Sequence, residues 1–167
     1  MSKILFYVFF SALAVVSAAQ PGRVYRSLEE VSDPALVYHL QLHGKRLKHV
    51  PAQVYEMVHL EVLDLRSNKI NYLSDSLALL TNLQRLDVSR NPLREIPAAV
   101  AQLSQLKELV VWSTYVTSLP TEISCLNESL QVIDMRSCPL TYDDQQAIEQ
   151  LLPNVKKLWN YACNCSE

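Results

Sequence analysis

Apolar residues recur along this chain with a period of about 23 residues. The most regular unit is the stretch LQRLDVSRNPLREIPAAVAQLSQ, which covers residues 83–105. Corresponding units begin at Val37, Leu60, Leu83, Leu106 and Leu130. Three of the four intervals between these starts are 23 residues long and the last is 24. A fixed period of this size is typical of a solenoid, because no single unit can bury its apolar side alone.

Each unit opens with a segment in which apolar residues alternate with others, and this period of two predicts a β-strand. Successive strands should lie parallel, with their leucines pointing inward. In the regular unit, Pro97 precedes Ala98–Ala101, which predicts a short helical turn with the proline at its first position. Ser74 is expected to cap the corresponding turn of the unit before it. The sequence therefore predicts an α/β solenoid with a concave parallel β-sheet of about five strands and short helices or 3-10 turns on the convex side.

The repeats cover residues 37–140, and the segments on either side of them are predicted to be caps. Residues 20–36 predict an N-terminal helical cap, with a polar lead-in followed by a capping box at Ser27-Leu28-Glu29-Glu30. Residues 141–167 predict a C-terminal cap and a tail that contains cysteines. The cap should consist of a helix that ends at Pro153, an extended segment over residues 155–159, and Trp159 as its apolar plug.

Residues 1–19 have the composition of a signal peptide. Lys3 is followed by an apolar run over residues 4–16, broken only by Ser11, and small residues near Ala19 suit a signal peptidase. The run is shorter than the roughly 20 apolar residues of a membrane span. We expect cleavage near Ala19, export to the periplasm, the cell surface or the medium, and no membrane span in the mature chain. An uncleaved membrane anchor is the alternative.

The repeats resemble the leucine-rich repeat family, in the class with 23-residue units and the consensus LxxLxLxxNxLxxLPxxIxxL. Residues 83–103 match every consensus position when aliphatic exchange is allowed. The flanking segments are similar to those of small exported leucine-rich repeat proteins of Gram-negative bacteria of the Bacteroidetes type. The resemblance implies a right-handed solenoid whose concave sheet binds a protein or peptide. Lys45, Thr114 and Cys138 replace three of the five consensus Asn residues, so the usual loop hydrogen bonds are not implied at these positions.

The outward positions of the strands give a candidate binding surface. Trp112 is its most informative residue, because Trp, Tyr and Arg are enriched at interface hot spots. The alternative is that Trp112 lies flat over Arg136 or Arg90 as a cation–π surface pair. The recurring Asp residues are expected to pair laterally with nearby arginines. The predicted contact residues are Arg66, Arg85, Asp87, Trp112, Tyr115 and Arg136.

The size of this surface limits the partner. Five strands spaced by about 4.8 Å, each with about five residues, present roughly 400 Å² in projection. A stable protein interface buries about 800 Å² per partner. The contact should therefore be weak or peptide-sized unless loops add area.

Four cysteines follow the leader: Cys125, Cys138, Cys163 and Cys165. In an oxidising compartment they allow three complete pairings, and the sequence does not choose among them. Cys138 occupies an Asn position of the repeat, where a buried free thiol is favoured. Cys125 could then form a disulfide with Cys163 or Cys165. A thiol-redox or metal-binding role of the Cys163-x-Cys165 tail is an alternative, although a structural zinc site usually has four ligands.

The composition argues against several functional classes. The net charge is −2, without the basic footprint of a nucleic-acid-binding protein. Gly22 and Gly44 are the only glycines, so no phosphate-binding loop or nucleophile elbow can form. His39 and His43 are about 13 Å apart along a strand, too far to share a metal ion. We expect no enzyme, cofactor, metal or nucleic-acid partner.

The sequence thus predicts a monomeric, non-enzymatic module that binds an unidentified protein or peptide. The rival hypothesis is a structural or self-assembling component of the cell envelope, in which the concave face is incidental.

Overall fold

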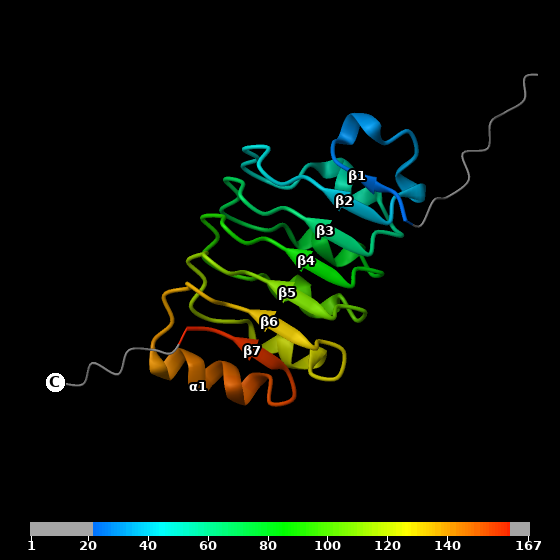
Figure 1. Cartoon of the computed structure of the whole chain (residues 1–167). Coiled ribbons are helices and arrows are strands. Elements are labelled where there is room, and N and C mark those ends of the chain that lie inside the picture. Colours follow the sequence, from blue (N-terminus) through cyan, green and yellow to red (C-terminus); the bar gives the residue numbers. More distant parts are fainter. Residues whose placement is uncertain (1–21, 161–167) are drawn as a thin grey trace, which may run out of the picture.

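The computed structural model describes residues 22–160 as a stack of short parallel strands backed by 3-10 turns (Figure 1). Seven strands form one sheet, and they follow each other in chain order. The predicted signal peptide and the tail cysteines Cys163 and Cys165 lie outside the described residues. The strands are β1 (Val24–Tyr25), β2 (His39–Gln41), β3 (Val62–Asp64), β4 (Arg85–Asp87), β5 (Glu108–Val110), β6 (Val132–Asp134) and β7 (Lys156–Leu158).

The side of the stack opposite the sheet is built from 3-10 turns and not from α-helices. Each turn between two repeat strands has only five or six residues, too few for a stable α-helix. One α-helix, α1 (Tyr142–Leu151), lies across the C-terminal end of the stack (Figure 1). The 3-10 turns are η1 (Leu28–Glu30), η2 (Pro34–Leu36), η3 (Ala52–Glu56), η4 (Asp75–Leu79), η5 (Ala98–Gln102) and η6 (Thr121–Leu126).

The inward leucines of successive repeats lie in register and form the core. The paired central positions of β2 to β6 are Leu40, Leu63, Leu86, Leu109 and Ile133. All five have no exposed surface. Each repeat thus covers the apolar side of the one before it, which is the packing that the 23-residue period predicts.

The residues at the starts of η4 and η5 agree with the prediction, except for the exact position of the proline. Ser74 caps η4 as predicted, because its hydroxyl accepts a hydrogen bond from the Ser76 N–H at 3.2 Å. Pro97 is the N-cap residue of η5 and not its first helical residue. This extended position is compatible with proline, which has no N–H to donate.

Both ends of the sheet differ from the prediction of about five strands. Val24 and Tyr25, predicted as part of a polar lead-in, pair with His39 and Leu40 as an edge strand. Tyr25 is buried, so it covers the first repeat. At the other end, the predicted extended segment becomes β7 and pairs in parallel with β6. Trp159 packs half-buried against the core beside it.

The predicted capping box at Ser27 is not formed. The Ser27 side chain makes no bond to a backbone N–H of η1 and contacts the Glu30 carboxylate at 3.4 Å. Glu30 accepts a hydrogen bond from the Arg26 N–H instead. A three-residue turn is too short for the reciprocal bonds of a capping box. A complete capping box occurs at α1, between Thr141 and Asp144.

Asn side chains tie neighbouring repeats together beyond the ends of the strands. The Asn91 amide donates hydrogen bonds to the carbonyl of Leu65 in the preceding repeat and to that of Val88 in its own repeat. Its oxygen accepts from the Ile70 N–H at 2.9 Å. Asn68 repeats this arrangement one unit earlier. Each buried Asn therefore satisfies backbone groups that no strand can pair.

Thr114 and Cys138 occupy the Asn position in their repeats and form fewer hydrogen bonds there than Asn68 and Asn91 do. The Thr114 hydroxyl donates to the Val111 carbonyl of its own repeat at 2.7 Å. The Cys138 thiol reaches back to the same carbonyl at 3.3 Å and also contacts the Thr114 hydroxyl. Among residues 22–160 Cys138 has no disulfide partner, and it is only partly buried, whereas a buried thiol was predicted.

A left-handed residue stands immediately before each Asn position. The five residues with positive φ at this place are Gly44, Ser67, Arg90, Ser113 and Ser137. The N–H groups of the first four donate to carbonyls of the following repeat, with distances of 2.8–3.1 Å. The turn of the chain therefore continues the inter-strand ladder. For an L-residue this conformation costs about 1–2 kcal/mol, and only Gly44 avoids that cost.

Replacing Asn91 by alanine should strongly destabilise the protein. Asn91→Ala removes the bonds from Asn91 to the Val88 carbonyl and from the Ile70 N–H to Asn91. It also removes one of the two bonds to the Leu65 carbonyl, which keeps its bond from Asn68. Each lost bond that leaves a buried group unsatisfied costs about 1–3 kcal/mol. We expect the free energy of unfolding, measured with urea, to fall by about 3 kcal/mol. Asn82→Ala is the control, because the exposed Asn82 makes one bond to Val58 and should lose less than about 1 kcal/mol. Equal losses in the two variants would contradict this account.

Glycine should stabilise the fold at a left-handed position. Ser67 is exposed with φ of 57°, so Ser67→Gly removes strain at little loss of contact. We expect a gain of about 0.5–1 kcal/mol in urea unfolding, after the entropy that glycine adds to the unfolded chain. Ser104 is exposed too, but it does not have positive φ. Ser104→Gly should therefore lower the stability, and the same sign for both variants would refute the argument.

Candidate functional site

The recurring Asp residues on the sheet face hold their own strand ends. Asp64, Asp87 and Asp134 are each the last residue of a strand, and each is less than 10% exposed. Their carboxylates accept a hydrogen bond from the N–H two residues later, at 3.0–3.2 Å. Asp87 also accepts a bond from the Ser89 hydroxyl at 2.6 Å. This is the Asx-turn bond that Asp favours where a strand gives way to a loop.

The arginines of this face pair mainly with the Asp of their own strand. Arg66 contacts Asp64 at 3.3 Å, and Arg136 contacts Asp134 at 2.7 Å. Residues two apart on a strand lie on the same face, which brings these groups together. The hydrogen bonds that Arg136 donates to the Asp134 carboxylate, and the attraction of its charge, raise the pKa of Arg136 above its ordinary value.

The predicted pairing of the recurring Asp residues with Arg66, Arg85 and Arg136 is confirmed, and each pair joins residues of one repeat. Between repeats, Arg85 pairs with Glu108, and His43 Nδ1 lies 3.5 Å from the Asp64 carboxylate. Asp87, predicted as a contact residue, is only 5% exposed, and its carboxylate accepts a hydrogen bond from the Ser89 N–H of its own loop. Arg66, Arg85 and Arg136 stay half-exposed but are already paired, so a partner has to compete with their carboxylates.

Trp112 lies half-buried at the end of the sheet face with an arginine over its ring. The Arg90 guanidinium carbon is 4.6 Å from the ring centroid. The cation–π alternative considered from the sequence is thus the observed geometry, with Arg90 and not Arg136 as the cation. In neighbouring repeats Arg90 and Trp112 occupy adjacent positions, so the repeat register brings them together. Such a pair orders the ring and leaves part of its surface accessible.

Tyr115 lies beside this pair, in the loop after β5. Its side chain is 58% exposed, and the Arg94 guanidinium carbon is 5.7 Å from its ring centroid. A hollow of about 390 Å³ opens beside one member of each pair, Arg90 and Tyr115. It is lined by Arg90, Asn91, Pro92, Ser113, Thr114, Tyr115 and Ser137. We call Trp112, Tyr115, Arg90 and Arg94 the Trp112 cluster.

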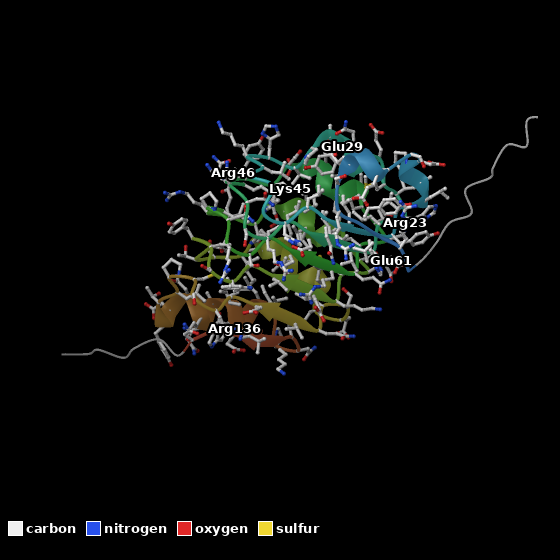
Figure 2. All side chains as sticks on the ribbon, turned by 45° about the horizontal axis from the view of Figure 1, so that its top comes forward. Arg23, Glu29, Lys45, Arg46, Glu61 and Arg136 are labelled. Atoms are coloured by element: carbon white, nitrogen blue, oxygen red, sulfur yellow. The ribbon has the colours of Figure 1, made fainter. Side chains whose placement is uncertain are left out.

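The structure thus divides the six predicted contact residues into two groups. Trp112 and Tyr115 join the cluster, and the other four lie on the sheet face. There Arg85 pairs with Asp87, Arg66 with Asp64, and Arg136 with Asp134. Arg94 was missed as a contact residue. The signal that could have identified it is the repeat offset, because Arg94 precedes Tyr115 by nearly one period. Figure 2 shows Arg136 toward the C-terminal end of the stack and Arg46 toward the opposite end.

Within residues 22–160 no three His, Cys, Asp or Glu side chains converge as metal ligands. Over the same range, no helix has the length and apolar character needed to cross a membrane. Cys125 lies exposed in η6. The predicted disulfide of Cys125 with Cys163 or Cys165 remains a prediction, because both tail residues lie outside this range.

Comparison with known families agrees with the repeat architecture. A family model described as "Leucine-rich repeat region" matches residues 35–167, which is most of the chain. The chain belongs to the leucine-rich repeat family. Proteins of this family are typically binding modules and not enzymes. A search of curated proteins with the sequence found no match.

Solved structures of leucine-rich repeat proteins share the fold. A leucine-rich repeat protein of Leptospira interrogans is 22% identical, with a TM-score of 0.53 over 84% of this chain and 47% of its own. An internalin of Listeria monocytogenes is 26% identical, with a TM-score of 0.56 over 72% of this chain and 32% of its own. TLR13, in a complex with ssRNA13, is 20% identical, with a TM-score of 0.67 over 83% of this chain and 20% of its own. This leucine-rich repeat chain thus spans less than half of each of these chains.

Arg90 and Trp112 should be energetically coupled in the leucine-rich repeat stack. We expect a double-mutant cycle with Arg90→Gln and Trp112→Leu, followed by urea unfolding, to give a coupling of about 0.5–1 kcal/mol. A matched cycle with Arg94→Gln and Trp112→Leu should give nearly none, because Arg94 contacts Tyr115. If the coupling energy with Trp112 is no larger for Arg90 than for Arg94, the cation–π pair does not contribute to stability.

Proposed function

We propose that this leucine-rich repeat protein recognises a protein or peptide through the Trp112 cluster and the adjoining sheet face. The observation that carries the proposal is the cluster itself, where Trp112 and Tyr115 each lie against an arginine beside a hollow of about 390 Å³. Tyr115 is more than half exposed, so the fold does not require its burial. Residues of these types dominate the energetics of protein interfaces.

The geometry favours binding of a modest segment. The cations hold the two rings in place before a partner arrives, which reduces the entropy lost on binding. The sheet face alone presents roughly 400 Å², half of what a stable interface buries per partner. The hollow beside Tyr115 enlarges this surface on the side of the loops. A peptide or an extended loop of a protein therefore fits better than a flat protein surface.

A nucleic acid is a weaker candidate for the partner. The chain has a net charge of −2, whereas nucleic-acid binding is supported by a basic surface. The TLR13 structure contains ssRNA13, but at 20% identity the likeness concerns the fold alone. Protein or peptide recognition is also the commoner use of repeat stacks with an extended sheet face.

The proposed location is outside the cytoplasm, in the periplasm, at the cell surface or in the medium. The support is the leader over residues 1–19, with Lys3 followed by an apolar run and small residues near Ala19. The similarity to small exported bacterial proteins of the 23-residue class is a further reason. Fractionation of cells that express the full chain tests this location.

The alternative function is self-assembly through the ends of the stack. The two outer strands argue against it, because short and charged edges discourage pairing with a second copy. β1 has only two residues, and β7 carries Lys156 and Lys157. The Lys157 ammonium contacts the Glu149 carboxylate of α1 at 2.8 Å. A monomer is therefore the expected state, and a larger mass in size-exclusion chromatography would favour the alternative.

The decisive test is affinity capture from envelope extract and culture medium. The mature protein should retain a partner that the Trp112→Ala, Arg136→Glu variant loses, because the variant removes the ring and reverses an exposed charge. The matched control is Tyr142→Ala with Lys107→Glu, which makes the same kinds of change at exposed positions away from the cluster. Melting curves of all three proteins should agree before capture.

The outcomes separate the hypotheses. A partner held by wild type and control but lost by the Trp112 variant supports recognition at the cluster. Equal capture by all three proteins places the binding surface elsewhere, on the 3-10 side or at the caps. Capture of nothing, together with elution as an oligomer, supports the structural role.

A further inference from the structure

Three cations from three successive repeats surround a second hollow next to the Trp112 cluster. This hollow has a volume of about 460 Å³ and is lined by Lys48, Lys69, Asn71, Pro92, Arg94 and Tyr115. It shares Pro92 and Tyr115 with the hollow described above. The two hollows therefore lie next to each other, with Pro92 and Tyr115 lining both.

The repeat register explains this arrangement. Lys48, Asn71 and Arg94 occupy the same position in three successive repeats, and Lys69, Pro92 and Tyr115 occupy another position two residues earlier in the unit. Short side chains thus alternate with long ones in both columns. Asn71 lies between Lys48 and Arg94, and Pro92 lies between Lys69 and Tyr115. The long side chains form the corners of the hollow, and the short ones leave its centre open.

The backbone at two of these corners is fixed. The Lys69 N–H donates to the Leu47 carbonyl of the preceding repeat, and the Tyr115 N–H donates in the same way to the Leu93 carbonyl, both at 2.8 Å. The corners therefore keep their spacing, which for neighbouring repeats is about 4.8 Å at the strands. A preformed spacing of this kind reduces the cost of binding.

The charges of this hollow have no partner within the described part of the chain. Lys48, Lys69 and Arg94 are exposed, and none of them forms an ion pair with a carboxylate of residues 22–160. The lining contains no acidic side chain. The arginines of the sheet face differ, because their own Asp residues neutralise them. The hollow is thus a local positive field on a protein of net negative charge.

We propose that this hollow binds the acidic side chains of an extended peptide segment, which continues across Tyr115 onto the Trp112 cluster. The inference rests on the proposed function and specifies the chemistry of its partner. Carboxylates at every second residue of an extended chain are about 7 Å apart on one side. That spacing lies between one and two repeat spacings, so successive carboxylates can reach successive cations. An apolar or aromatic residue of the same segment packs on Tyr115.

A nucleic acid or an isolated anion fits this site less well. Sequence-independent binding of nucleic acid depends on many phosphate contacts, whereas this hollow offers three cations. Lys48 and Arg94 lie two repeats apart, about 9.6 Å at the strands, so several carboxylates along one segment match the cations better than a single phosphate or sulfate. The affinity of such a segment should fall steeply with salt because the cations are exposed.

The test measures fluorescence anisotropy of a labelled peptide of alternating Glu and Ser with one central Tyr. We expect Lys69→Glu with Arg94→Glu to weaken its binding at low salt by about tenfold or more. Lys107→Glu with Lys156→Glu is the matched control, since both side chains are exposed and neither lines the hollow. The control should bind like wild type. A peptide of alternating Lys and Ser, inorganic phosphate and a single-stranded oligonucleotide complete the set.

Each outcome decides the proposal. Selective loss of binding in the Lys69 and Arg94 variant supports it, and failure of inorganic phosphate to compete at the same concentration supports a multivalent segment. Equal loss in the control, tighter binding of the oligonucleotide, or no binding of the acidic peptide to wild type overturns it. If affinity capture yields a partner that the Lys69 and Arg94 variant still holds but the Trp112 variant loses, the proposed function stands and this inference falls. If the acidic peptide binds but affinity capture yields no partner, the anion-binding hollow is supported and the proposed function is contradicted.

Discussion

The hydrogen-bond ladder between repeats is the constraint on which the rest of this structure depends. The repeat strands have three residues each, too few to hold a sheet by themselves. The ladder continues past them through the left-handed residues, whose N–H groups donate to the next repeat, and through Asn68 and Asn91. These bonds hold each repeat against the one before it, at the distance that separates two neighbouring strands. A shift of the register by one residue would expose the leucines and leave the buried Asn side chains without their hydrogen-bond partners.

A fixed register turns positions of the repeat into columns on the surface. Two residues meet in the folded protein when their offsets within the unit are equal or adjacent, whatever their separation in the chain. Arg90 lies over Trp112 for this reason, and Lys48 and Arg94 flank Asn71. The outward surface is therefore determined by the residues at a few outward positions of the repeat, while the leucine and Asn positions maintain the stack. Variation at the outward positions can change the partner without changing the fold.

The repeats could be predicted from the sequence because their core positions obey one simple rule. Leu40, Leu63 and Leu86 lie buried in register, as the period requires. The N-terminal edge strand could not, because β1 contains only Val24 and Tyr25, and two residues carry no periodicity. The pairing of Arg66 with Asp64 could be predicted too, because residues two apart on a strand share a face. The contact of Arg94 with Tyr115 could not, since each lies in a loop where neither strand nor helix periodicity constrains the direction of a side chain.

The candidate site occurs where the sequence departs from its own repeat rule. Thr114 replaces the Asn of its repeat, and the only carbonyl to which its hydroxyl donates among the described contacts lies in its own repeat. The hydroxyl is also smaller than the amide it replaces, and Ser113 and Ser137 beside it are short. The hollow between Arg90 and Tyr115 therefore results from the same substitutions that weaken the ladder locally. A loss of stability that coincides with an open, aromatic surface is the arrangement expected where selection favours binding over packing.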